Sequence, residues 1–204
     1  TQHKNSRTHN IDTLTVHCYV GQYTAKQMCD YFATTNVACS ANYCVGYDGS
    51  IGLSVDEKDR SWCSSNRAND MRAITIEVAC EKTTPYTVTS KAYSTLITLL
   101  TDICKRNGIK KLLWKADKSL IGKPDQQNMT VHRWFKNKAC PGDYLYNRMG
   151  EIAITVNNNL NSSSTTGTLY RVQVGAFSNY SNAQKLKAEL EAKGYKPFII
   201  EVKK

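Results

Sequence analysis

The segment 129–145 contains a histidine, a lysine and a cysteine at a spacing that suits metal chemistry. His132 precedes Cys140 by eight residues, and Lys138 lies two residues before that cysteine. Imidazole nitrogen and thiolate sulfur are the ligands that zinc takes most readily in proteins. Two ligands on one helix would be three or four residues apart, so this spacing requires a loop. Two readings stay open: half of a metal site, or a surface histidine beside an ordinary buried cysteine.

Two further polar side chains lie in β-rich segments. Residues 12–19 alternate between apolar and polar, and His17 leaves the end of this predicted strand on the polar face. A lone histidine in such a place is more often a hydrogen-bonded residue of the core or of its rim than a metal ligand. Glu77 is the one charge in the apolar run 73–80, and an unpaired carboxylate is costly to bury. Glu77 is therefore expected to face a wet cleft or a cationic partner.

Two aromatic residues are candidates for contact with a substrate. Asp48-Gly49 predicts a tight hairpin turn, because glycine accepts positive φ without steric cost, and Tyr43 lies on the first arm of that hairpin. A strand tyrosine is more often structural than functional. Trp62 follows in a loop, where an indole packs the rim of a fold as readily as it contacts a ligand. The residues alone leave both roles open.

Strands and helices must position these side chains. The longest predicted helix can be capped by Thr89 or Ser90, has apolar residues at helical spacing and stops at Gly108. A terminal helix is expected to start at Pro141, a favourable first position. Strands are predicted over 12–19, 42–47, 50–55 and 73–80, and helices over 24–34, 89–107 and 141–156.

Composition limits the class of protein. With 204 residues, 41% of them hydrophobic, the chain can form one domain and a small appendage. The net charge of +10 favours an anionic partner such as nucleic acid, a membrane or a teichoic-acid-bearing cell wall. No apolar run is long enough to cross a bilayer and no secretory signal is visible, so no membrane insertion is expected. Most of the eight cysteines lie in apolar runs and are expected to be reduced core residues. His3 and His9 lie in the polar N-terminal segment, which is expected to be frayed.

The composition changes abruptly near residue 157. Residues 157–168 are polar and predict a flexible linker. Beyond it, an amphipathic helix over 182–193 lies between two strand-like segments, which predicts a small βαβ unit. A unit of this size cannot hold a core by itself, so it is expected to need a partner. The chain is accordingly divided into 1–156, 157–168 and 169–204.

Residues 11 to about 153 resemble the type 2 N-acetylmuramoyl-L-alanine amidases, a family that also includes peptidoglycan-recognition proteins and many phage endolysins. The resemblance rests on an ordered set of blocks: TVHCYV, the Tyr43 strand with its DG hairpin, DRSWCSSN, ITIEVA and VHRWFKNKACPG. It implies an α/β fold with a mixed central β-sheet flanked by helices. Residues 169–204 resemble the first half of the sporulation-related repeat domain, a peptidoglycan-binding module, and RVQVGAFSNYSNA is the specific part.

This resemblance implies roles for individual residues. In the family, two histidines and a cysteine or aspartate bind zinc, and these positions fall on His17, His132 and Cys140. Cys18 and Cys63 depart from the residues found in many members, which bears on substrate contacts rather than on the metal. The other implied roles are catalytic for Glu77, Lys138 and Tyr43 and substrate-binding for Trp62.

The implied reaction is zinc-dependent hydrolysis of the amide between N-acetylmuramic acid and L-alanine in bacterial peptidoglycan. Zinc supplies the water nucleophile, Glu77 transfers the proton, and Lys138 and Tyr43 stabilise the oxyanion. The alternative is a non-catalytic peptidoglycan-recognition protein. A nucleic-acid binder with a structural zinc is disfavoured, because paired Cys-x-x-Cys motifs and aromatic platforms are missing.

The resemblance also bears on location and assembly. An endolysin would act first in the host cytoplasm and then at the cell wall, whereas the alternative is secretion to the wall. A solitary half repeat is expected to interleave with a second copy into a four-stranded sheet, which predicts a homodimer. The alternative is that the half repeat is a truncation and is poorly ordered.

Overall fold

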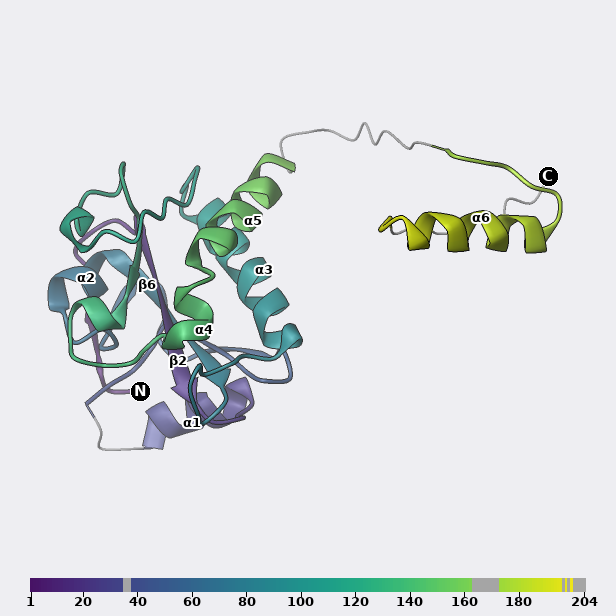
Figure 1. Ribbon diagram of the computed structural model, residues 1–204. Helices are drawn as coiled ribbons and strands as arrows, with labels where there is room; N and C mark the ends of the chain where they lie inside the picture. The colour runs from purple at the N-terminus through teal and green to yellow at the C-terminus, as the bar shows by residue number, and fades with distance from the viewer. Residues whose placement is uncertain (35–37, 163–172, 196, 198, 200–204) are drawn as a thin grey trace. The chain divides into compact units, whose positions relative to one another are not determined.

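A mixed β-sheet with helices on both faces forms the larger part of the chain in the computed structural model (Figure 1). The structure describes residues 1–34, 38–162, 173–195, 197 and 199. Its contacts divide the chain into two compact units, Thr1–Ser164 and Thr165–Lys204.

The sheet has five strands in the order β4-β3-β6-β2-β7. The β2·β6, β2·β7 and β3·β6 pairs are parallel, and only the β3–β4 hairpin is antiparallel. Gly49 in this hairpin has φ +84°, as the Asp-Gly turn predicts. The mixed sheet expected from the sequence is therefore confirmed. The strands are β2 (Thr13–Val20), β3 (Tyr43–Val45), β4 (Ile51–Leu53), β6 (Ala73–Cys80) and β7 (Met129–Val131).

The helices follow the predicted periodicity closely. In the long helix α3, the Thr89 hydroxyl accepts a hydrogen bond from the backbone N–H of Ala92, and the chain turns away at Gly108 with φ +68°. The helices of this unit are α1 (Ala25–Thr34), α2 (Arg67–Arg72), α3 (Ser90–Arg106), α4 (Gly142–Tyr146) and α5 (Met149–Ser162), with short 3₁₀ turns at η1 (Lys118–Leu120) and η2 (His132–Trp134). A two-stranded sheet joins β1 (Lys4–Ser6) to β5 (Asp59–Ser61), so the N-terminal opening is paired rather than frayed.

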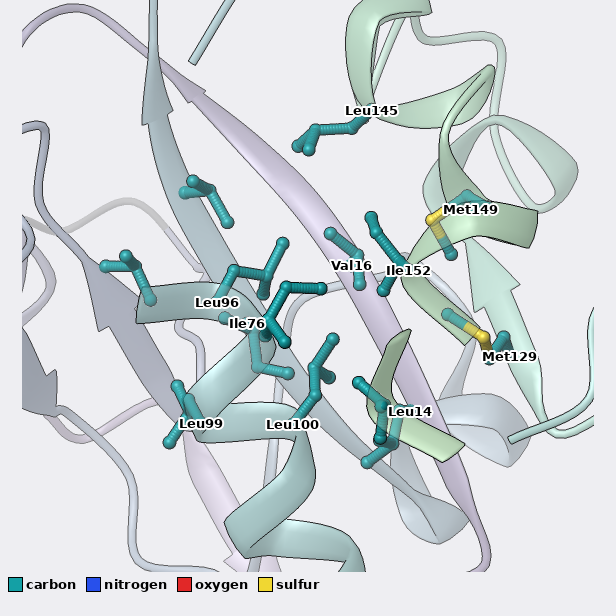
Figure 2. Close-up of a cluster of buried hydrophobic side chains, with 14 of the residues drawn as sticks. Leu14, Val16, Ile76, Leu96, Leu99, Leu100, Met129, Leu145, Met149 and Ile152 are labelled. Carbon is teal, nitrogen blue, oxygen red and sulfur yellow. The ribbon is translucent and has the colours of Figure 1, made fainter. Parts of the chain in front are cut away.

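The main hydrophobic core lies between the sheet and the helices α3 and α5 (Figure 2). Leu14 and Val16 of β2 and Ile76 of β6 point to this side, because alternate strand residues share a face. Leu100 of α3 and Ile152 of α5 meet them there, and all five side chains are fully buried. Helices α3 and α5 thus cover the apolar face of the sheet.

The opposite face of the sheet is more polar. Thr15 of β2 hydrogen-bonds Thr130 of β7 through their hydroxyls at 2.7 Å, and the amide of Asn69 donates to Thr15 at 3.0 Å. Helix α1 covers part of this face with a small apolar cluster that includes Met28 and Cys44. This face therefore leaves room for polar side chains near the ends of β2, β6 and β7.

Two boundaries differ from the sequence prediction. The predicted terminal helix is two helices, and Pro141 is the residue that precedes α4 rather than its first residue. Helix α5 continues through Ser162 into the segment predicted as linker, because Asn157 hydrogen-bonds the backbone of Leu112 and Leu160 packs against the core. The first unit therefore extends beyond residue 156.

The C-terminal unit contains the predicted helix, α6 (Tyr180–Ala192). The strand predicted over 169–177 lies partly outside the described residues, and residues 173–177 are not in a strand. The strand predicted over 196–202 lies almost wholly outside the described residues. Within the described residues, no helix has the length and apolar character needed to cross a membrane.

Candidate metal and hydrolase site

The register of the parallel strands brings His17, Glu77 and His132 to one edge of the sheet. His17 pairs directly with Glu77 across β2 and β6. Val16 pairs with Val131, so His132 follows the end of β7 beside His17. Because these strands run the same way, their carboxyl ends meet at this edge, where ligands bind in open α/β sheets.

A loop after β7 returns Cys140 to the same edge. The backbone N–H of Arg133 donates to the carbonyl oxygen of Cys140 at 3.1 Å. The Arg133 guanidinium donates to the carbonyl oxygen of Ala139 at 2.6 Å and pairs with Asp143 at 3.0 Å. Arg133 therefore closes the loop, which accounts for the eight-residue separation of His132 and Cys140.

His17, His132 and Cys140 form one cluster. Their candidate ligand atoms all lie within 4.8 Å of one another. The Cys140 sulfur lies 3.4 Å from Nδ1 of His17, and the two imidazole rings are 5.1 Å apart between centroids. The backbone N–H of Cys18 donates to the Cys140 sulfur at 3.3 Å, an interaction that favours the thiolate. The structure thus gathers the three residues that the sequence singled out as ligands.

The protonation states of the cluster suit a cation. Burial lowers the pKa of His17 well below its ordinary value, and the neighbouring His132 lowers it further. Burial also lowers the pKa of His132, with the Lys138 ammonium adding to the effect. Both imidazoles are therefore neutral at pH 7 and keep a lone pair for a metal. Burial raises the pKa of the Cys140 thiol, and a bound cation would counter this by stabilising the thiolate.

Glu77 lies beside the cluster in an unusual environment for a carboxylate. Its Oε1 lies 3.9 Å from Nδ1 of His17 and accepts a hydrogen bond from the Cys63 thiol at 3.6 Å. Burial raises the pKa of the Glu77 carboxyl to about 7, against the opposing effect of the Cys63 thiol. Its Oε2 is buried and has no hydrogen-bond partner in the part of the chain that the structure describes. A carboxylate with such a pKa and a free oxygen suits proton transfer near neutral pH.

Tyr43 does not reach this edge. Its hydroxyl donates to Oε1 of Glu57 at 2.7 Å and accepts from Arg106 at 3.3 Å. In the register of β3 and β6, the residue opposite Glu77 is Cys44. Successive strand residues face opposite sides, so Tyr43 lies on the side of the sheet covered by α3. The prediction that Tyr43 stabilises an oxyanion is therefore wrong.

Lys138 lies near the cluster but outside it, whereas the described contacts of the Trp62 ring are with the N-terminal segment and Arg60. Lys138 is exposed and close enough to His132 to lower the pKa of that imidazole. The Trp62 indole N–H donates to Oδ1 of Asn5 at 2.7 Å, and its ring lies 5.4 Å from the ring of His3 between centroids. The N-terminal segment therefore holds the indole, and the role of Trp62 in substrate binding stays a prediction.

Sequence reasoning missed the loop that follows Trp62. Ser64 and Ser65 approach the two histidines, each hydroxyl lying 3.2 Å from an Nε2 atom. The small polar residues after Trp62 were the sequence feature that could have indicated these contacts, but such runs are common in loops. The contacts join positions far apart in the sequence, so no local pattern predicts them.

The residues present fit zinc. Two neutral imidazoles and one thiol are a ligand set typical of zinc, and three protein ligands leave one position open, as in catalytic sites. The Glu77 carboxylate lies against this set, and its Oε2 has no hydrogen-bond partner in the described ranges of the chain. A buried polar oxygen without a partner is costly, and a water molecule or a polar group of a substrate beside it would satisfy it.

The fold defines the structural class of the protein. Solved structures with similar folds include a mutant endolysin from Bacillus subtilis, with 14% identity and a TM-score of 0.56 over 76% of this chain and 92% of that one. An AmpD derivative has 20% identity and a TM-score of 0.56 over 75% and 91% of the two chains. The Drosophila peptidoglycan recognition protein PGRP-SA has 13% identity and a TM-score of 0.54 over 72% and 82%. At these identities the similarity establishes the fold, which is that of amidases and peptidoglycan-recognition proteins.

The sequence identifies the family more closely. A family model described as N-acetylmuramoyl-L-alanine amidase matches residues 7–143, about two thirds of the chain. The chain therefore belongs to the N-acetylmuramoyl-L-alanine amidase family. A SPOR domain model matches residues 147–204, beginning two residues before helix α5 rather than at residue 169. No curated protein sequence matches the chain significantly.

Proposed function

We propose that this protein hydrolyses the amide bond between N-acetylmuramic acid and L-alanine in bacterial peptidoglycan, with zinc held by His17, His132 and Cys140. The observation that carries the proposal is the convergence of these three side chains within 4.8 Å, with the carboxylate of Glu77 3.9 Å from His17. Membership of the amidase family supports the same reaction.

The chemistry divides between the metal and the protein. Zinc, when bound, supplies Lewis acidity that lowers the pKa of a water molecule to about 7 and polarises a carbonyl group. Glu77 accepts a proton from the attacking water at Oε2 and delivers it to the amide nitrogen that leaves. The carbon–nitrogen bond breaks, the water oxygen stays in the lactyl carboxylate, and L-alanine leaves with a free amine.

Lys138 and Trp62 are assigned supporting roles. The Lys138 ammonium, which lies close enough to His132 to affect its pKa, stabilises negative charge on the carbonyl oxygen. A single donor of this kind is typically worth about 3 kcal/mol in the transition state. Trp62 offers its ring, which is half-buried against the N-terminal strand, to the substrate at the rim. The basic net charge of +10 favours approach to an anionic cell wall.

A turbidity assay on purified cell walls tests the proposal. The protein is expected to clear the suspension, to stop when a chelator removes zinc, and to resume when zinc is restored. New amino termini, identified as L-alanine, would establish which bond is cut. Binding to the walls without clearing, in the presence of excess zinc, would instead support a non-catalytic recognition protein, the alternative that the similarity to PGRP-SA keeps in view.

The cell wall is the proposed place of action. We assign the protein an endolysin-type role, in which it acts from the host cytoplasm on the wall, with secretion to the wall as the second route. The endolysin among the similar folds and the SPOR match support action on peptidoglycan. Release of the protein from cells without lysis would favour secretion.

The C-terminal unit is proposed to pair with a second copy of the chain. Its described apolar side chains include Val174, Phe177, Tyr180 and Tyr195, which are 47–67% exposed. A small unit that exposes these groups gains most by burying them against an identical unit. Light scattering is expected to give the mass of a dimer for the full chain and of a monomer after deletion from Leu169 onward. A monomeric full chain would contradict the pairing.

A further inference from the structure

Three consecutive residues of one loop each contact a different member of the site. The thiol of Cys63 donates to Oε1 of Glu77 at 3.6 Å. The hydroxyl of Ser64 lies 3.2 Å from Nε2 of His17, and that of Ser65 lies 3.2 Å from Nε2 of His132.

Two buried residues of helix α2, Asn69 and Asp70, hold this loop in place. The carboxylate of Asp70, which is almost fully buried, accepts the backbone N–H of Cys63 at 3.0 Å and that of Ser64 at 3.0 Å. The amide of Asn69 donates to the Ser64 hydroxyl at 3.2 Å. Ser65 has φ +57°, a left-handed conformation that a serine adopts at a cost. Such strain persists only where surrounding contacts hold the backbone in place.

We propose that residues 63–65 are a positioning segment, in which Cys63 orients the Glu77 carboxylate and Ser64 and Ser65 orient the imidazoles of His17 and His132. The inference rests on the proposed function for its catalytic part, whereas its zinc-binding part stands on the three ligands alone.

Cys63 controls which oxygen of Glu77 is free. Because the Cys63 thiol engages Oε1, the carboxylate presents Oε2, which has no partner within the described part of the chain, for proton transfer. Burial raises the pKa of the Cys63 thiol, so the group stays protonated and remains a donor. Removal of the thiol lets the carboxylate rotate about its last bond. Small misplacements of a catalytic group reduce turnover by up to about 100-fold.

Ser64 and Ser65 act on the metal ligands. A hydroxyl at Nε2 fixes the plane and the tautomer of an imidazole, so that Nδ1 carries the lone pair. In His17, Nδ1 is the atom that faces Cys140. Loss of such an outer partner typically lowers metal affinity by about 10- to 100-fold.

The test measures two quantities that separate these roles. Cys63→Ala is expected to lower kcat about 10- to 100-fold with KM and zinc affinity unchanged, and Cys63→Ser, which keeps a donor, to restore most of kcat. Ser64→Ala is expected to weaken zinc binding about 10- to 100-fold, measured on the metal-free full chain by competition with a chelator. Cys104→Ala, which removes a buried thiol from α3, and Ser94→Ala are matched controls expected to change neither quantity.

The outcomes distinguish this inference from the proposed function. A parental chain that binds zinc but does not hydrolyse peptidoglycan overturns the proposed function, while the zinc affinity of Ser64→Ala still tests the segment. An active parental chain with an equally active Cys63→Ala variant overturns the role of Cys63. Equal losses in Cys63→Ala and Cys63→Ser, together with a lower melting temperature, would show a packing role and overturn the positioning role as well.

Discussion

Replacement of His132 with alanine is expected to abolish zinc binding and to lower the rate of peptidoglycan hydrolysis by about 1,000-fold or more. His132 provides one of only two imidazoles in the cluster, and its loss leaves two ligands, His17 and Cys140. The Lewis acidity of zinc contributes several kcal/mol to stabilisation of the transition state. A loss of about 4 kcal/mol corresponds to a rate about 1,000-fold lower. The fold is expected to survive, because this side chain lies at the sheet edge and outside the hydrophobic core.

The measurement for His132→Ala combines zinc content, cell-wall clearing and a melting curve. His9→Ala is the matched control, since that histidine is exposed and lies in the N-terminal segment away from the cluster. It is expected to keep one zinc per chain and the parental rate. Hydrolysis by His132→Ala at the parental rate would contradict a zinc mechanism, whereas loss of the folded state would call for the milder variant His132→Gln.

Glu77→Gln is expected to lower kcat by about 100- to 10,000-fold while zinc stays bound. Glutamine has nearly the shape of glutamate and keeps the contact with the Cys63 thiol, but it cannot accept a proton. The oxygen that would take the proton, Oε2, has no other partner among the described residues, so no neighbouring group replaces it there. The variant therefore separates proton transfer from metal binding.

Single-turnover rates on a soluble muropeptide and zinc content measure the effect of Glu77→Gln. Glu151→Gln is the matched control with an expected parental rate, because this exposed carboxylate on the first turn of α5 accepts a hydrogen bond from the Tyr93 hydroxyl. Full activity in Glu77→Gln with bound zinc would show that another group transfers the proton. Loss of zinc together with activity would show that Glu77 acts mainly as a metal ligand.

Local patterns predicted most of the elements around the site. The alternation along 12–19 placed His17 on the face opposite Leu14 and Val16, and the structure confirms this. The periodicity of α3 and its cap at Thr89 follow from side-chain geometry and hydrogen bonding within a few residues. Such features are readable because their causes are local.

Errors arose where strand register or tertiary packing decides the outcome. A one-residue change in register moves a side chain to the other face of a sheet, so the sequence did not reveal that Cys44 rather than Tyr43 lies opposite Glu77. The linker prediction failed in its first part because the polar residue Asn157 gains partners from the backbone of Leu112. A polar composition does not predict such contacts.

Most strands and helices around the site, the family, and the residue types able to bind zinc were predictable from the sequence, because they depend on local periodicity and on the chemistry of single side chains. Tertiary folding was needed to show that His17, His132 and Cys140 meet and that residues 63–65 contact three members of the site. It was also needed to show that one oxygen of Glu77 has no partner among the residues that the structure describes. These contacts join residues up to 123 positions apart, and strand register and loop closure bring them together.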